Sequence, residues 1–207
     1  MSQYVAADVD GTVFVGKRRV KYNHFAHTIN FTREQVSFIE EAAIARQKFK
    51  EQQIAGGVKI RDKRIIDRDD LETHYLGIMG EIAVATLVGL LPDLNTYLSS
   101  PLADLVLFGV PIEIKTLQGF LVFNTLEDFR GEVAALVTYT PGNKNACSVQ
   151  GWITKKQFEE QHFIDNFGYG DRLCMQPTNL LPIQTLGTYC LMRDHLKAVM
   201  RVVNEGG

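Results

Sequence analysis

Apolar residues recur with a helical period in the first long segment of the chain that contains neither glycine nor proline. Thr32 and Gln35 form a capping box at its start, in which the two side chains satisfy backbone N–H groups at a helix N-terminus. The apolar positions continue to about Gln53, just before two consecutive glycines. The pattern predicts a helix over residues 33–53.

A second helical pattern begins after Asp69 and ends at a proline-containing turn at residues 92–93. Its interior contains Gly77 and Gly80, and each glycine costs about 1 kcal/mol relative to alanine in a helix. At about 100° of rotation per residue, Glu81 lies on the face of Gly77 and not on the fully apolar face. The pattern predicts a carboxylate where the glycines leave room for a close neighbour.

The N-terminal part of the chain predicts a β-hairpin. Two runs of strand-forming residues between positions 4 and 22 flank the pair Asp10-Gly11. This pair is favoured in two-residue type I′ turns, because both central residues of such a turn need a positive φ angle. We expect residues 1–65 to form a hairpin and helix elaboration on a single domain that extends over residues 1–207.

The second half of the chain predicts a sheet with further helices. From residue 103 onward, short apolar runs are separated by turn signals, as expected of strands. A second capping box, formed by Thr154 and Gln157, predicts another helix, and the tail predicts a helical segment near residues 193–203. Strands interspersed with helices predict an α/β fold.

Composition and charge narrow the class of protein. The 207 residues are 45% hydrophobic and 22% charged, which is typical of a globular domain and excludes a disordered or collagen-like chain. The 22 basic and 24 acidic residues give a net charge of -2, which excludes a generally basic protein that coats nucleic acid through bulk charge. Basic residues are grouped at 17–21, 61–68 and 155–156, so the sequence is compatible with a local basic groove.

Cysteine usage and the lack of long apolar runs predict a cytoplasmic protein without a membrane partner. The three cysteines are too scattered for a metal knuckle and odd in number for a disulfide framework, so we expect reduced thiols. No apolar run approaches the roughly 20 residues of a membrane span, and the N-terminus lacks the layout of a signal peptide.

The two strands around Gly109-Val110 bring candidate chemistry together. A simple hairpin places the following residues opposite each other: Phe108 and Pro111, Val106 and Glu113, Asp104 and Lys115. Asp104, Glu113 and Lys115 then share one face of the sheet, and Ile112 and Ile114 point to the other face. Asp104 and Glu113, with the backbone carbonyl of Ile114, offer hard oxygen ligands for Mg²⁺, and Lys115 can position an attacking water.

This arrangement resembles the PD-(D/E)xK nucleases, the restriction endonuclease-like superfamily. The resemblance is carried by Gly80-Glu81 on a helix, Asp104 before a strand, and Glu113-Ile114-Lys115 on the next strand. It covers residues 71–190, where GWITKKQF and LLPIQTL are also similar to segments of phage and prokaryotic proteins of this type. The resemblance implies a mixed central sheet flanked by helices, with a nuclease-like core over residues 66–192.

By the same resemblance, the protein is a Mg²⁺-dependent DNA nuclease of the cytoplasm of bacteria or of phage-infected cells, and Mn²⁺ is an acceptable substitute. Asp104 and Glu113 would bind the metal, Glu81 would support it directly or through water, and Lys115 would orient the nucleophile. Apart from the resemblance, four further residues are candidates for contacts to DNA: His74, Lys144, Lys155 and Lys156. A buried or capping histidine and solvated lysines account for the same residues equally well. A homodimer and a phage or host protein partner are compatible with the sequence.

The chain departs from the family pattern at two places. The literal Pro-Asp pair is Pro92-Asp93, so Asp93 is an alternative metal ligand to Asp104. Where the family has a core helix after the ExK strand, residues 117–131 predict only a short helix near Thr125 to Phe129.

Two other interpretations account for some of the same residues. Glu113 and Lys115 on an exposed strand face would be solvated charges, with a surface ion pair worth about 0–1 kcal/mol; a non-catalytic DNA-binding or scaffolding relative of the same fold is the functional alternative. Asp8 and Asp10, in the sequence DVDGTV, resemble the first motif of haloacid dehalogenase-like phosphatases. That family also requires a late pair of acidic residues, and Asp171 is followed by RLCM without a second acid.

Overall fold

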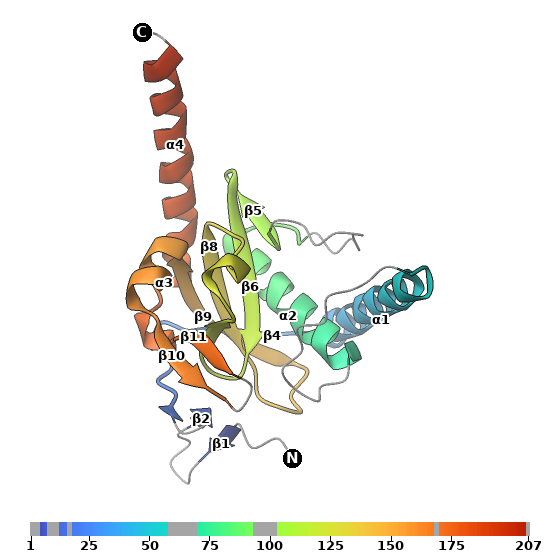
Figure 1. Ribbon diagram of the computed structural model, residues 1–207. Coiled ribbons are helices and arrows are strands. Elements are labelled where there is room, and N and C mark those ends of the chain that lie inside the picture. The colour runs from blue at the N-terminus through green and yellow to red at the C-terminus, as the bar shows by residue number, and fades with distance from the viewer. Residues whose placement is uncertain are drawn as a thin grey trace.

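Five strands pair into the central sheet of the protein, in the order β4-β9-β8-β6-β5 (Figure 1). The computed structural model describes residues 5–7, 13–15, 18–57, 70–92, 103–167 and 170–205. The strands of this sheet are β4 (His27–Asn30), β5 (Leu105–Leu107), β6 (Val110–Leu117), β8 (Val133–Thr138) and β9 (Ala146–Thr154). Only the pair β6 and β8 is parallel. The predicted mixed α/β fold is confirmed.

Every residue of β8 is buried, because both faces of the sheet are covered there. Side chains alternate between the faces along β6. Ile112 and Ile114 belong to the larger core cluster, which lies against α2 (Asp70–Val88). On the other face, Ala134 and Leu136 of β8 belong to a second cluster. The sheet therefore separates two hydrophobic cores, and the predicted split of β6 into two faces is correct.

Helices α1 (Arg33–Ala55) and α2 pack against each other on the side of the larger core (Figure 1). The capping box of Thr32 and Gln35 is present at the start of α1. Helix α2 ends at Val88, earlier than predicted, because Gly89 adopts a φ of 71° and the N–H of Leu90 donates to the carbonyl of Ala85 at 2.9 Å. This is a Schellman cap, which stops a helix before the next proline is reached. The cap residue predicted at Asp69 lies outside the described residues.

Gly80 lies where α2 comes closest to the sheet. A Cβ atom at this position would overlap Thr116 Oγ1 and lie 3.4 Å from Ile114 Cγ2. Gly77, one turn earlier, has room for a Cβ atom, since the nearest atom is Arg46 Nη1 at 4.0 Å. The two glycines of α2 thus have different structural roles: Gly80 permits close contact with β6, and Gly77 leaves space for a side chain of α1.

The N-terminal hairpin is confirmed, in a different register. β1 (Val5–Ala7) and β2 (Val13–Val15) are antiparallel, and β3 (Arg18–Arg19) pairs with β2. An unbroken two-residue turn at Asp10-Gly11 would place Ala7 opposite Phe14, whereas Ala7 pairs with Val13. The turn itself lies outside the described residues.

The hairpin of β5 and β6 corrects the predicted register by two residues. Leu107 pairs with Val110 and Leu105 with Ile112, so the turn consists of Phe108 and Gly109. Their φ angles of 48° and 70° are those of a type I′ turn, in which glycine normally takes one or both central positions. The prediction failed because Phe108, a residue that seldom adopts a positive φ, was assigned to the strand. A shift of two residues keeps every side chain on its predicted face.

The crossover from β6 to β8 contains no α-helix. It passes through β7 (Leu121–Phe123) and the single 3₁₀ turn η1 (Leu126–Asp128), in agreement with the short helix predicted there. β7 joins β11 (Asp171–Met175) and β10 (Phe163–Asn166) in a separate antiparallel sheet. The predicted capping box of Thr154 and Gln157 starts the next helix, α3, whose bounds are Lys155–Gln161.

The C-terminal helix α4 (Leu186–Glu205) begins earlier than predicted and projects away from the sheet (Figure 1). Its first turns are fixed to the body because Leu186 and Cys190 are buried in the larger core. Two 3₁₀ turns, η2 (Pro177–Asn179) and η3 (Ile183–Thr185), precede it.

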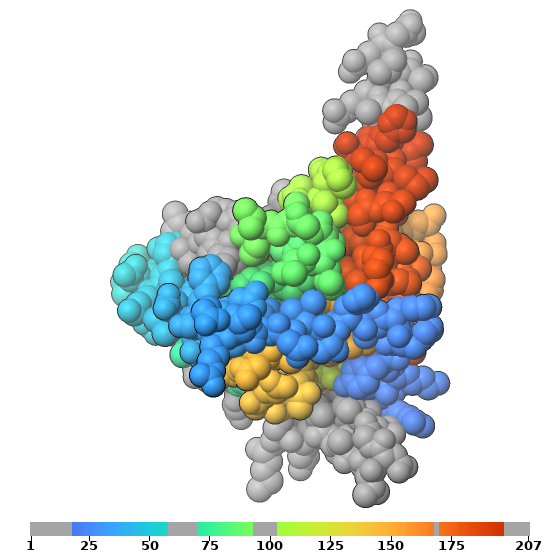
Figure 2. Space-filling model, turned by 180° about the vertical axis from the view of Figure 1, so that it is seen from behind, coloured from blue at the N-terminus to red at the C-terminus, as the bar shows by residue number. Residues whose placement is uncertain are grey.

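Figure 2 shows the chain from Arg18 onward, in blue, crossing the back of the molecule beside α2 and the base of α4. None of the helices in the described parts of the chain has the length and apolar content that a membrane crossing requires.

Candidate active site

Glu113 is the most deeply buried acidic side chain on the face of β6 that points away from α2. It is 3% exposed, and both of its carboxylate oxygens accept hydrogen bonds. Lys115 Nζ donates to Oε1 at 2.5 Å, and the backbone N–H of Arg130 donates to Oε2 at 2.8 Å. Because residues two apart on a strand share a face, β6 presents this carboxylate and this ammonium group side by side. The Lys115 ammonium also lies 5.0 Å from the centre of the Phe123 ring.

Asp104 joins this pair from the start of β5. Its Oδ2 accepts a hydrogen bond of 2.6 Å from the N–H of Ile114, and its own N–H donates to the carbonyl of Ile112 at 3.0 Å. Burial raises the pKa of Asp104, and the negative charge of Glu113 acts in the same direction. The N–H of Ile114 and the charge of Lys115 act to lower this pKa, but burial is the larger effect. The structure therefore brings Asp104, Glu113 and Lys115 together.

The loop before β8 contacts this group of three through the backbone N–H of Arg130, which donates to Glu113. Lys155 Nζ donates to the carbonyl of Phe129 at 2.7 Å, which fixes the loop to the start of α3. Gly131 is packed tightly, since a Cβ atom there would lie 2.8 Å from the carbonyl oxygen of Val133 and 3.0 Å from the N of Glu113. Arg130, between them, is exposed. No sequence signal pointed to Arg130, because only the parallel pairing of β6 with β8 brings it beside Glu113.

Glu81 lies on α2 and so on the opposite face of the sheet from Glu113. Its carboxylate is held by both terminal nitrogens of Arg46 in α1, at 2.8 and 2.7 Å. The close neighbour that the sequence predicted beside Gly77 and Glu81 is thus a guanidinium group of the same chain, which still leaves room for a Cβ atom at Gly77. Among the residues that the structure describes, no group of three or more His, Cys, Asp or Glu side chains is arranged to hold a metal ion. Asp93, the alternative ligand, lies outside those residues.

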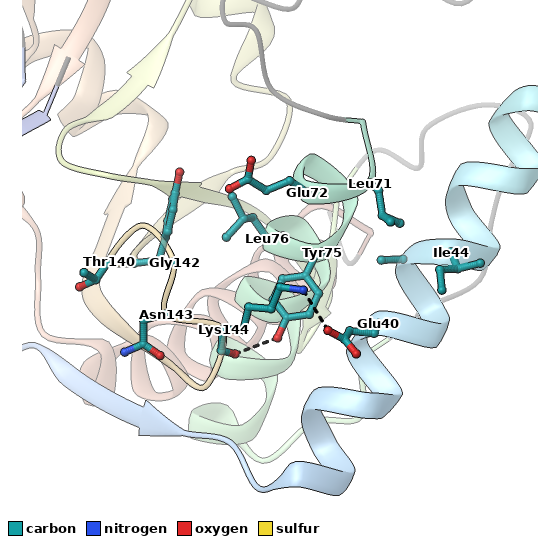
Figure 3. Close-up of a pocket in the computed structure, with 12 residues that line it drawn as sticks. Glu40, Ile44, Leu71, Glu72, Tyr75, Leu76, Thr140, Gly142, Asn143 and Lys144 are labelled. Carbon is teal, nitrogen blue, oxygen red and sulfur yellow. Dashed lines mark hydrogen bonds and ion pairs between the residues drawn. The ribbon is translucent and has the colours of Figure 1, made fainter. Parts of the chain in front are cut away.

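The residues expected to contact DNA do not form one surface. Lys155 is bonded to the loop that contacts Glu113, through the carbonyl of Phe129, and Lys156 is exposed at the start of α3, 4.0 Å from Glu160. His74 is half-buried in α2. Lys144 lies elsewhere, at a pocket between α1, α2 and the loop from β8 to β9 (Figure 3).

This pocket has a volume of about 370 Å³ and a floor that includes Tyr75, Leu76 and Tyr139. At its edge, Lys144 Nζ contacts Glu40 Oε1 at 3.0 Å, and the hydroxyl of Tyr75 donates to the carbonyl of Lys144 at 2.8 Å (Figure 3). Burial, with a smaller contribution from Glu40, raises the pKa of Tyr75 to about 12. Lys144 is therefore neutralised by a glutamate of α1, and the pocket is lined by the helices that cover the larger core.

Replacing Asp104 with asparagine is expected to increase the thermal stability of the metal-free protein at neutral pH. A carboxyl group whose pKa is higher in the folded protein than in the unfolded chain stabilises the fold at low pH, and this contribution is lost as the pH rises through the folded-state pKa. At pH 8 the wild-type protein bears the cost of a buried charge, whereas the asparagine oxygen can still accept from Ile114 without one.

Melting temperatures of Asp104→Asn and wild type, measured in EDTA at pH 4 and pH 8, test this expectation. We expect a gain of a few degrees at pH 8 and a smaller gain at pH 4, since about 1 kcal/mol corresponds to about 2–4 °C in a chain of this length. Asp194→Asn, at an exposed position of α4, is the control. A larger gain at pH 4 than at pH 8 would contradict the role of burial.

Comparisons of the chain with models of known protein families, with curated proteins and with solved structures find no match. The assignment of a function therefore depends on the chemistry of the residues that the fold brings together.

Proposed function

We propose that the protein is a Mg²⁺-dependent nuclease of the PD-(D/E)xK type, which hydrolyses phosphodiester bonds in DNA. The observation that carries the proposal is the group of Asp104, Glu113 and Lys115 on one face of β5 and β6, with Lys115 Nζ 2.5 Å from Glu113 Oε1. A restriction endonuclease-like identity for the mixed α/β fold is part of this proposal.

The residues present fit a divalent cation. Asp104 and Glu113 supply hard oxygen ligands at one place, and Mg²⁺ is commonly bound by one or two carboxylates together with water and substrate phosphates. Burial and the negative charge of Glu113 both raise the pKa of Asp104. A cation bound between the two carboxylates would offset the charge of Glu113 and so lower this pKa. When bound, Mg²⁺ supplies positive charge that stabilises the negative charge developing on the phosphate. Mn²⁺ is the expected substitute.

Lys115 is the residue that faces the reacting water in this proposal. Its side chain is 30% exposed, so solvent can reach the ammonium group while Glu113 fixes its position. From there it can donate a hydrogen bond that orients the attacking water, and its charge favours the developing transition state. We leave Glu81 out of the proposed metal ligands, because Arg46 holds its carboxylate and α2 packs on the other face of the sheet.

A specific observation favours a second candidate, a non-catalytic DNA-binding or scaffolding protein with the same fold. Both oxygens of Glu113 already accept hydrogen bonds from Lys115 and Arg130, as in an ion pair that only stabilises the fold. A buried pair of this kind adds little net stability, and breaking it is costly only where the charge left behind stays buried. The two candidates differ in whether the protein turns over substrate.

Cleavage assays separate the two candidates. Purified protein is incubated with plasmid, linear duplex and single-stranded DNA in Mg²⁺ or Mn²⁺, and parallel reactions contain EDTA. We expect cleavage with either metal, loss of cleavage in EDTA, and loss of cleavage in Lys115→Met. Lys48→Met, at an exposed position of α1, is the matched control and should retain the wild-type rate. Cleavage that persists in EDTA or in Lys115→Met, or the lack of cleavage of every substrate, would reject the nuclease assignment.

A further inference from the structure

Arg130 is a cation placed beside the two carboxylates by its own backbone. Its N–H donates to Glu113 Oε2 at 2.8 Å, so the main chain of Arg130 is bonded to the side chain that the proposed function places at the metal. The side chain of Arg130 extends from this point into solvent.

The loop that carries Arg130 is fixed on both sides. On one side, Lys155 donates from Nζ to the carbonyl of Phe129 at 2.7 Å and from its backbone N–H to the carbonyl of Glu132 at 3.0 Å. On the other side, the N–H of Glu132 donates to the carbonyl of Pro111 at 2.9 Å, at the start of β6. Gly131 allows this approach because three backbone groups leave no room for a Cβ atom. The backbone of Arg130 is therefore held at a fixed position beside Glu113.

The guanidinium group of Arg130 differs from the other cations near this site. Arg193 contacts Glu132 at 2.8 Å, Lys115 contacts Glu113, and Lys155 is bonded to a backbone carbonyl. Within the parts of the chain that the structure describes, no carboxylate lies within ion-pair distance of the Arg130 guanidinium. Its binding capacity is thus available to a ligand.

We infer that Arg130 binds a non-bridging phosphate oxygen of the substrate next to the Asp104 and Glu113 carboxylates, and that Lys155 is the positioning residue that holds its loop. A guanidinium group presents two parallel N–H donors that match a phosphate, and it is charged at neutral pH. The inference rests on the proposed function for the identity of the ligand as a phosphodiester. It adds a residue that contacts substrate to the three already placed at the site.

Binding and cleavage measured separately test this inference. Fluorescence anisotropy of a labelled single-stranded or duplex oligonucleotide in EDTA reports binding without cleavage, and initial rates in Mg²⁺ report KM and kcat. Arg130→Ala should weaken binding about tenfold or more, as expected for a hydrogen bond to a charged group. It should also lower the slope of log Kd against log salt by about one. The backbone N–H that holds Glu113 is kept in this variant, so we expect it to fold.

Two further variants make the test specific. Arg33→Ala, at an exposed position at the start of α1, removes the same charge away from the site and should bind as wild type does. Lys155→Met should weaken binding less than Arg130→Ala, and the double variant should be no weaker than Arg130→Ala alone, because Lys155 acts through Arg130. Arg130→Lys should recover part of the affinity.

The outcomes distinguish this inference from the proposed function. Loss of binding in EDTA on Arg130→Ala, with no cleavage by the wild-type protein, would support the phosphate site and reject the nuclease. Cleavage by wild type with unchanged binding and unchanged KM in Arg130→Ala would reject the role of Arg130 and leave the nuclease in place. An equal loss of binding in Arg33→Ala would also reject a specific site, since bulk charge would then explain both variants.

Discussion

Glu113→Gln is expected to reduce cleavage by about 10²–10³-fold while leaving the protein folded, the size of effect seen when one preorganised charged or polar group is removed from a catalytic site. Glutamine keeps the shape of the side chain, and its amide oxygen can accept from the N–H of Arg130 as Glu113 Oε2 does. It cannot neutralise a cation or the ammonium group of Lys115. Initial rates of plasmid nicking at saturating Mg²⁺ measure the effect.

The stability of Glu113→Gln separates loss of chemistry from loss of folding. Lys115 is partly exposed, so its ammonium group can turn toward solvent, and we expect a loss of only about 1 kcal/mol in the free energy of unfolding. Glu159→Gln, at an exposed position of α3, changes the net charge equally and is expected to cleave at the wild-type rate. A Glu113→Gln protein as active as wild type would place the catalytic group elsewhere.

Gly80→Ala is expected to destabilise the protein by about 1–3 kcal/mol, the range found when a methyl group is forced into a packed core. The added Cβ would meet Thr116 Oγ1 and Ile114 on β6, and threonine has few alternative rotamers because it is branched at Cβ. Gly77→Ala, one turn away in the same helix, should instead stabilise the protein by up to about 1 kcal/mol, because alanine is the better helix former and space is present.

Urea unfolding of both variants measures the difference between these glycines, and a double variant identifies its cause. Thr116→Ala removes the oxygen that the new methyl group would overlap, and the atom then nearest on residue 116 is Cβ at 3.4 Å. Gly80→Ala/Thr116→Ala should therefore regain most of the stability lost in Gly80→Ala. Equal stability of Gly80→Ala and Gly77→Ala would show that α2 is not pressed against β6 at this position.

Elements defined by neighbouring residues could be predicted from the sequence. Both capping boxes, at Thr32 and Thr154, are present because their hydrogen bonds join residues three apart. The start of α4 was missed, since its first turns depend on the burial of Leu186 and Cys190 in the larger core. Local sequence signals therefore predicted that these helices exist, whereas tertiary packing determines where some of them begin.

Within the candidate site, the faces of β6 were predictable and the partners were not. The alternation of a strand assigns Glu113 and Lys115 to one face whatever the register of the hairpin, and Asp104 shares that face as long as the register changes by an even number of residues. Arg46 and Arg130 reach Glu81 and Glu113 from distant parts of the chain, through the packing of α1 on α2 and the crossover to β8. Such contacts have no signature in a local pattern.

The turn of Phe108 and Gly109 determines which side of the sheet Asp104 occupies. A two-residue type I′ turn fixes β5 against β6, so one inserted or deleted residue would exchange the two faces of β5. Asp104 would then enter the core beside α2, and Leu105 would take its place next to Glu113. The two-residue length of this solvent-facing turn thus decides whether Asp104 belongs to the acidic site. We expect an insertion or deletion of one residue in this turn to remove Asp104 from the site.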